Sequence, residues 1–172
     1  NPTLTLSKSS SAVPSPLGSG GTFNWVLTAV VSSGPTVANA TITDTLPPGF
    51  TVNGTITDSA DNGQAAKMTC TPNGAVPGAT GFSCTLASTA ANGTYTITVP
   101  VKAPTVTGST QCVQYTNVAT ATFAAVGGVP GGTVVQTNNS NSVTVTCPAL
   151  SITKSAVDSN VDFGQNVQFD IV

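Results

Sequence analysis

The start of this chain recurs at its end, and this recurrence sets the size of the unit that must fold. A shift of 146 positions aligns residues 2–26 with residues 148–172 without a gap. Seven aligned positions are identical: Pro2/Pro148, Leu4/Leu150, Lys8/Lys154, Ser9/Ser155, Gly18/Gly164, Phe23/Phe169 and Val26/Val172. A period this long matches a whole domain and not a solenoid unit. The sequence therefore predicts a complete domain over residues 1–147 and the start of a second, incomplete repeat over residues 148–172.

Short runs of alternating apolar and polar residues fill the first unit. Thr and Val dominate these runs and favour strands, whereas the Gly, Pro, Ser and Asn clusters between them favour turns. The predicted strands cover residues 3–8, 22–31, 37–46, 51–57, 65–71, 81–87, 93–103, 114–123 and 141–147. About eight or nine short strands at this spacing indicate an all-β, two-sheet sandwich with Greek-key connections.

The composition excludes several classes of function. The chain has four basic and six acidic residues, and no His, Arg or Glu. Four scattered lysines cannot form the positive field that nucleic-acid binding requires. Without His we expect no catalytic triad, no zinc or other transition-metal site and no cofactor, so an enzyme is not expected. No apolar run approaches the length of a membrane helix, so no membrane span is expected.

Four cysteines, all in the first unit, indicate an oxidising environment outside the cell. Their even number and the absence of CxxC spacing favour disulfides over a metal site, although buried reduced thiols are the alternative. Three pairings are possible in principle. We favour Cys70–Cys84, which closes a local loop, and Cys112–Cys147, which ties two late strands together near the end of the first unit.

Several motifs resemble the conserved repeat domain of prokaryotic surface proteins, also called domain of unknown function eleven. The most specific are ATITDTLPPGF at residues 40–50, YTN at 115–117 and NNS at 138–140. The resemblance covers most of residues 3–146 and restarts at 150–172, but the Gly-rich segment at 124–136 and the cysteines depart from the common pattern. It implies an immunoglobulin-like β-sandwich that occurs in tandem in long secreted or wall-anchored proteins. It does not imply a specific ligand.

A covalent crosslink within the domain is the most specific chemical hypothesis. Lys8 lies in the first predicted strand, Asp44 ends a central strand and Asn117 lies in a late strand. Surface-adhesin sandwiches can join such a Lys to an Asn side chain. The chemistry needs a buried, neutral lysine as nucleophile and a protonated carboxyl that polarises the amide. The alternative is a solvated Lys, a turn Asp and an Asn that makes turn hydrogen bonds. Lys154 repeats the lysine in the second unit.

Other polar motifs have simpler interpretations. Four sequons, at Asn39, Asn53, Asn92 and Asn138, are candidate glycosylation sites, although a chain rich in Thr and Asn contains some by chance. Asp58, Asp61 and Asn62 offer oxygen ligands for Ca²⁺ but lack the spacing of an EF-hand loop, so we expect a polar hairpin turn there and no metal. Trp25, the only tryptophan, is expected to anchor the core, with carbohydrate stacking as the alternative.

These observations predict a structural, extracellular or cell-surface repeat domain that forms part of a filament, stalk or surface layer. The alternative is a ligand-binding adhesin domain, whose signature would be an exposed aromatic patch. The expected partners are copies of the protein or neighbouring repeats in a polymer. The two strands expected at 150–154 and 167–172 cannot bury a sandwich alone. They belong either to a longer repetitive chain, which we favour, or to a strand pair donated to another subunit.

Overall fold

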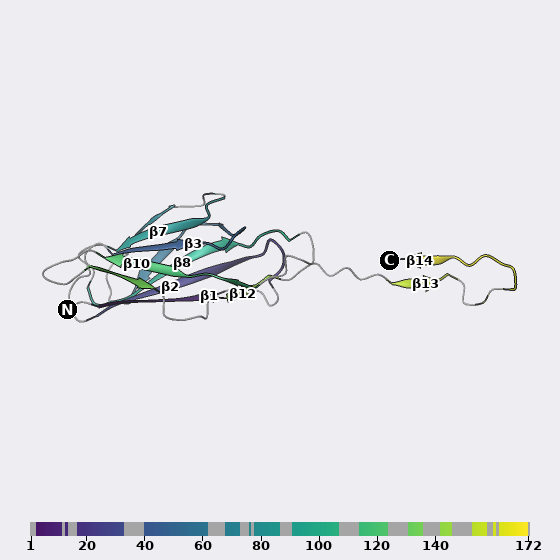
Figure 1. Ribbon diagram of the computed structural model, residues 1–172, viewed down its shortest axis with the longest axis horizontal. Helices are drawn as coiled ribbons and strands as arrows, with labels where there is room; N and C mark the ends of the chain where they lie inside the picture. Colours follow the sequence, from purple (N-terminus) through teal and green to yellow (C-terminus); the bar gives the residue numbers. More distant parts are fainter. Residues whose placement is uncertain are drawn as a thin grey trace.

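A computed structural model shows an all-β protein, as the sequence predicts. It describes residues 3–11, 13, 17–32, 40–61, 68–72, 76, 78–86, 91–106, 114–123, 131–135, 142–145, 153–157, 160 and 162–171. Two five-stranded antiparallel sheets pack as an immunoglobulin-like sandwich (Figure 1). The predicted fold class is confirmed. The described residues include no helix long and apolar enough to span a membrane.

The first sheet is built around two long neighbouring strands. Its order is β1 (Thr3–Ser11), β2 (Thr22–Ser32), β8 (Gly93–Lys102) and β4 (Thr51–Val52), and β5 (Thr57–Ala60) also pairs with β8. The β2–β8 ladder runs from Thr22 opposite Lys102 to Val31 opposite Gly93. β1 pairs with β2 along its whole length, so the β2–β8 pair determines where β1 lies.

The second sheet covers the inner face of the first. Its order is β11 (Gly132–Val135), β10 (Ala119–Phe123), β3 (Thr41–Thr45), β7 (Gly81–Leu86) and β6 (Met68–Thr71). A separate short ladder pairs β9 (Gln114–Thr116) with β12 (Ser142–Thr144). In Figure 1, β1 begins at one end of the sandwich and β12 lies towards the other.

Alternation along the strands separates the core from the surface. In β2 the inward positions are Phe23, Trp25, Leu27, Ala29 and Val31, and all five are buried. In β8 the inward positions from Tyr95 to Val101 are buried in the same way. Because side chains in a strand point alternately to opposite faces, one face of each sheet supplies the core and the other meets solvent.

Threonine and serine line the outward face of the second sheet. The register places four residues of one cross-strand row opposite one another: Thr122, Thr41, Thr85 and Thr69. The next row contains Thr120, Thr43, Ser83 and Thr71, and the Thr43 and Thr120 hydroxyl oxygens lie 3.1 Å apart. Cross-strand pairs of β-branched side chains stabilise a sheet without charge. These rows explain how so weakly charged a chain still presents a polar surface.

The structure divides the predicted strands more finely, so the described residues form twelve strands in the first unit where about eight or nine were expected. The run at 51–57 splits into β4 and β5, and the run at 114–123 splits into β9 and β10. The second split has a physical reason: β9 pairs with β12, whereas β10 pairs with β3 and β11, so the chain changes partners at Asn117 and Val118. Alternating sequence alone does not reveal such a change of sheet.

The second unit contributes a hairpin of β13 (Lys154–Ala156) and β14 (Phe169–Ile171), which pair only with each other among the described strands. Figure 1 shows this hairpin apart from the sandwich. In the first unit Lys8 lies opposite Leu27, whereas Lys154 lies opposite Ile171, the counterpart of Trp25. This register differs from that of the first unit by two residues. A register shift of two residues keeps every side chain on the same face of the hairpin. Such a shift is possible in β13–β14 because the register of a hairpin is weakly specified when neither face is buried.

Candidate crosslink site

The position of Lys8 follows from the alternation of β1. Leu4, Leu6 and Lys8 occupy successive inward positions, so the lysine enters the core behind two leucines. Only 1% of Lys8 is exposed. Lysine is almost never fully buried unless it is paired. Its burial on an inward strand position therefore requires partners in the opposite sheet.

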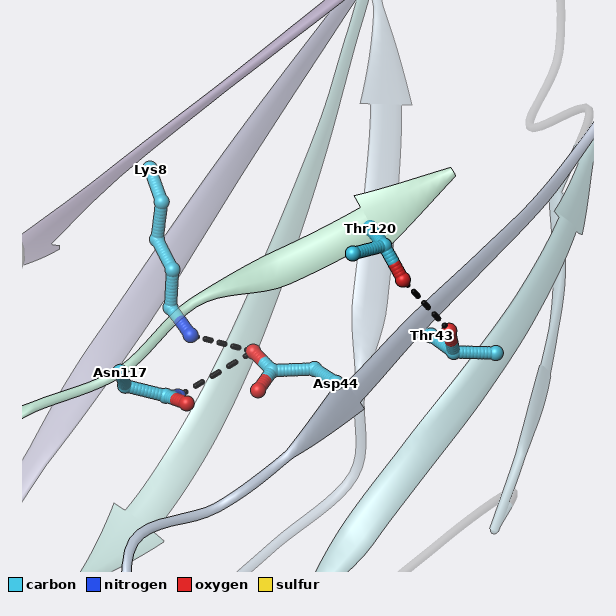
Figure 2. A network of polar contacts seen from close by, with 5 residues as sticks. All are labelled: Lys8, Thr43, Asp44, Asn117 and Thr120. Atoms are coloured by element: carbon cyan, nitrogen blue, oxygen red, sulfur yellow. Dashed lines mark hydrogen bonds and ion pairs between the residues drawn. The ribbon is translucent and has the colours of Figure 1, made fainter. Parts of the chain in front are cut away.

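Those partners come from two strands distant in sequence. Asp44 follows Ile42 on the inward side of β3, and Asn117 lies between β9 and β10. Both are buried, and Asp44 lies opposite Ala119 in the β3–β10 ladder, two residues beyond Asn117. With Lys8 they are the only buried polar or charged residues in the part of the chain that the structure describes. Figure 2 shows the three side chains converging.

A single carboxylate oxygen connects the three residues. Lys8 Nζ donates to Asp44 Oδ2 and forms a buried ion pair with it. Asn117 Nδ2 donates to the same oxygen at 3.2 Å. Asp44 Oδ1 has no hydrogen-bond partner among the described residues. The amine and the amide nitrogen are therefore held next to each other by one proton-accepting atom (Figure 2).

Aromatic side chains close the site from the first sheet. Lys8 Nζ lies 4.7 Å from the ring centroid of Trp25, which is fully buried. Phe23 packs edge-on against Trp25 at 5.0 Å and against Phe50 at 6.2 Å, and Phe50 packs against Tyr115 at 4.9 Å. Edge-to-face pairs at these separations are favourable. Trp25 therefore covers Lys8, and the other rings extend the packing from Trp25 to Tyr115.

Burial moves both ionisable groups towards their neutral forms. Desolvation lowers the pKa of Lys8 to about 8, against the opposing effect of Asp44. Desolvation likewise raises the pKa of Asp44, and this rise is opposed by the charge of Lys8 and by hydrogen bonds from Lys8 and Asn117. A low dielectric disfavours the charged form of each group, so it lowers the pKa of an amine and raises the pKa of a carboxyl. Burial therefore opposes the charged form of both groups, whereas the charge of each group supports the charged form of the other.

The aromatic cluster and Gly81 are features that the sequence analysis missed. Trp25 sits diagonally from Lys8 on one face of the β1–β2 ladder, so the register would have revealed the contact once the strand pairing was known. Gly81 lies opposite Thr45 in the β3–β7 ladder, where a Cβ atom would come within 2.7 Å of the Asp44 carbonyl oxygen. Glycine at this position allows β7 to approach β3 closely beside Asp44.

The structure joins Cys70 to Cys84 across the β6–β7 ladder, where the two residues lie directly opposite each other. Their Cα atoms are 4.0 Å apart. The bond ties β6, the edge strand of the second sheet, to its neighbour β7. Cys112 and Cys147 lie outside the described residues.

The remaining candidate residues are distributed over the surface. Asn53 and Asn92 are exposed, as N-linked glycosylation requires, whereas Asn39 and Asn138 lie outside the described residues. Asp58 Oδ2 accepts a hydrogen bond from the Met68 backbone nitrogen at 3.4 Å, and Asp61 Oδ1 accepts one from the Thr94 backbone nitrogen at 2.7 Å. The latter bond lowers the pKa of Asp61. Asp58 lies within β5 and Asp61 directly follows it, and because β5 pairs with β8 whereas β6 pairs with β7, these two strands do not form the expected hairpin. Asn62 lies outside the described residues.

Comparison with known proteins finds similarity at the level of the fold. No family model and no curated protein matches the chain. A single-residue variant of BcpA, the major pilin subunit of Bacillus cereus, superimposes with a TM-score of 0.64 at 13% identity, over 97% of this chain and 45% of that one. BcpA itself gives 0.61 at 13% identity, over 83% and 40%.

The full-length major pilin SpaD from Corynebacterium diphtheriae gives a TM-score of 0.57 at 11% identity, over 78% of this chain and 33% of that one. This chain spans less than half the length of each of these pilins. At such identities the comparison establishes a shared architecture. The chain has the antiparallel, immunoglobulin-like sandwich fold found in major pilin subunits.

Proposed function

We propose that this protein is a structural, extracellular β-sandwich domain and a unit of a filament, stalk or surface layer. We also propose that an amide bond between the Lys8 and Asn117 side chains stabilises this domain. The observation that carries the proposal is the buried cluster of Lys8, Asp44 and Asn117 inside a sandwich of the pilin type. A buried ion pair is by itself a poor source of stability, because desolvation offsets its attraction. A covalent bond between Lys8 and Asn117 would stabilise the domain where the ion pair alone does not.

The chemistry follows from the shared oxygen. The neutral Lys8 Nζ attacks the Asn117 side-chain carbonyl carbon and forms a C–N bond. Asp44 Oδ2 takes a proton from the attacking nitrogen and delivers one to Nδ2, because it contacts both nitrogens. The bond to Nδ2 then breaks and ammonia leaves. Asp44 ends with the protonation state it had at the start, so the reaction needs no cofactor and occurs once per domain.

The surface supports a structural role outside the cell. Rows of Thr and Ser cover the outward face of the second sheet, and a disulfide fastens one of its edge strands. Solved structures with a similar architecture include major pilin subunits. This similarity supports further copies or neighbouring repeats as the partners of this protein, joined in a continuous chain or by strand addition.

A ligand-binding adhesin receives less support from the described residues. Trp25, Phe50 and Tyr95, which could have stacked on a ligand, are buried in the core. The exposed large aromatic residues are Phe163 and Phe169, both in the second unit. The sandwich itself presents no aromatic platform among its described residues.

Intact-mass measurement of the purified protein tests the proposal. The crosslinked chain should be one ammonia lighter than its sequence, after correction for two hydrogens per disulfide. Asn117→Ala and Asp44→Ala should restore the full mass, whereas Lys154→Ala should retain the loss of ammonia. A wild-type chain of unchanged mass would refute the crosslink, and loss of one water in its place would assign the bond to Lys8 and Asp44.

A further inference from the structure

The position of Asn117 depends on the strands that flank it on either side. On its C-terminal side, Ala119 pairs with Asp44 in the β3–β10 ladder. On its N-terminal side, β9 pairs only with β12 among the described strands, and this ladder places Thr116 opposite Ser142. A short two-stranded ladder is only marginally stable by itself. The place of the Asn117 amide therefore depends on what holds β12.

Two buried valines hold β12 against the sandwich. Val143 is 3% exposed and Val145 is fully buried. Val143 lies opposite Tyr115, whose ring packs against that of Phe50 at a centroid distance of 4.9 Å. Val145 forms a parallel bridge with Leu17, which lies in the connection between β1 and β2. β12 therefore joins β9 to the connection that follows β1.

The connection between β1 and β2 is itself fixed to the end of β8. Gly21 N donates to the Gly18 carbonyl oxygen at 2.9 Å and closes a turn, and Ala103 N donates to the Gly21 carbonyl oxygen at 2.8 Å. A Cβ atom at Gly21 would come within 2.7 Å of Leu17 Cδ1, so the turn packs directly on the Leu17 side chain. Leu17 is buried and thus gives Val145 a fixed neighbour.

We propose that β12 positions Asn117 for the amide bond, so that the bond forms only after this last described strand of the first unit has docked. Val143 and Val145 are positioning residues in the reaction, because they act through β9, the strand that precedes Asn117. The inference deepens the proposed function and rests on it. The reaction itself is unchanged: Lys8 Nζ bonds to the side-chain carbonyl carbon of Asn117 and ammonia leaves.

The order of the strands along the chain gives this dependence a consequence. Lys8 and Asp44 lie in β1 and β3, so they precede β12 by about 100 residues or more and are made before it. Without β12, Thr116 has lost its ladder partner and the Asn117 amide is displaced. A displacement of about 1 Å can slow a reaction between positioned groups roughly 100-fold. An incomplete unit therefore keeps a free Lys8, and the crosslink closes on a unit whose strands are all in place.

The rate of ammonia loss in full-length variants tests the proposal. Val145→Asp places a carboxylate in a fully buried position next to Leu17 and should undock β12. Loss of ammonia should then be roughly 100-fold slower than in the wild type. Thr144→Asp adds the same charge on the exposed face of the same strand and should leave the rate unchanged. Chains made under oxidising conditions in a cell-free reaction, stopped in acid at intervals and weighed intact, give each rate.

A second pair of variants separates positioning from a general loss of stability. Val145→Ala and Val31→Ala each remove two methyl groups from a buried valine, but Val31 lies in β2, which pairs with β1 and β8. The stability that each substitution costs is measured by denaturant unfolding in the Asn117→Ala background, where no crosslink forms. For the same loss of stability, Val145→Ala should slow the loss of ammonia more than Val31→Ala does. A purely structural role of Val145 would not produce this difference.

The outcomes separate this inference from the function on which it rests. A wild-type chain that never loses ammonia would refute the crosslink, and the role of β12 would fall with it. Loss of ammonia at the wild-type rate in Val145→Asp would overturn the role of β12 and leave the crosslink standing. Should Val145→Asp not fold, the alanine pair decides, since equal slowing at equal loss of stability would overturn the role of β12.

Discussion

Two hairpins of similar sequence meet different surroundings in this protein. In β1–β2, Lys8 lies over the Trp25 ring and is buried beneath the second sheet. In β13–β14, Lys154 lies 4.0 Å from the centroid of the Phe169 ring, but its neighbours are exposed: Phe169 to 47% and Ile171 to 69%. The hairpin sequence thus brings a lysine onto an aromatic ring in both units. The acid comes only from the opposing sheet, and full burial of the lysine requires that sheet as well.

Substitution of Asn117, whose side-chain amide would accept the Lys8 amine, should cause the largest difference in stability between the two hairpins' variants. Asn117→Ala prevents the proposed crosslink, which would close a loop of about 110 residues and, by its effect on chain entropy, stabilise the fold by about 5 kcal/mol. For a domain of this size the melting temperature should fall by about 10–20 °C, measured by calorimetry. Lys154→Ala, which alters the exposed counterpart of Lys8, should leave the melting temperature of the sandwich within error. Equal melting of Asn117→Ala and wild type would contradict a covalent lock.

Substitution of the equivalent residues Phe23 and Phe169 should give the next largest difference in the free energy of unfolding. Phe23 and Phe169 occupy equivalent positions, but Phe23 is buried between Trp25 and Phe50. Phe23→Ala should destabilise the sandwich by about 3–5 kcal/mol because it leaves a cavity. Phe169→Ala should cost less than about 0.5 kcal/mol, as expected of an exposed position. Both should be measured by denaturant unfolding in the Asn117→Ala background, where unfolding is not limited by the crosslink. Similar losses at the two positions would mean that the second hairpin is covered in solution.

The pH dependence of stability should give the smallest but most specific signal. In Asn117→Ala, Lys8 remains an amine whose pKa is lowered from 10.5 to about 8. Between these values the unfolded chain binds a proton that the folded chain does not, so the free energy of unfolding rises with pH from about 8 to 10.5. Chemical denaturation at intervals across this range measures the slope.

Lys8→Met in the same background removes the titrating group and should abolish this slope. Lys154→Ala should preserve it, because Lys154 is exposed in the folded chain. A slope that persists in Lys8→Met would assign it to another group and contradict a desolvated Lys8.

Much of the fold could be predicted from the sequence because its signals are local. Alternation in TFNWVLTAVV, residues 22–31, marks β2 and its inward face, and the Pro-Pro-Gly at 47–49 marks the end of the segment that contains β3. The three residues of the candidate crosslink site were also named from the sequence, because surface-adhesin sandwiches can join a strand Lys to an Asn side chain with an acid nearby. The division of residues 114–123 between two ladders was not predictable, because it depends on which strand lies alongside.

The sequence by itself determined the all-β class, the position of Lys8 on the same strand face as Leu4 and Leu6, and the hydroxyl-rich outer surface, because strand alternation and residue propensity act over a few neighbouring positions. Only the tertiary structure decided that one oxygen of Asp44 contacts both Lys8 and Asn117, and that Trp25 covers Lys8. Those contacts join strands 36 and 73 residues apart. They depend on how the two sheets pack, and burial in the sandwich is what lowers the pKa of Lys8.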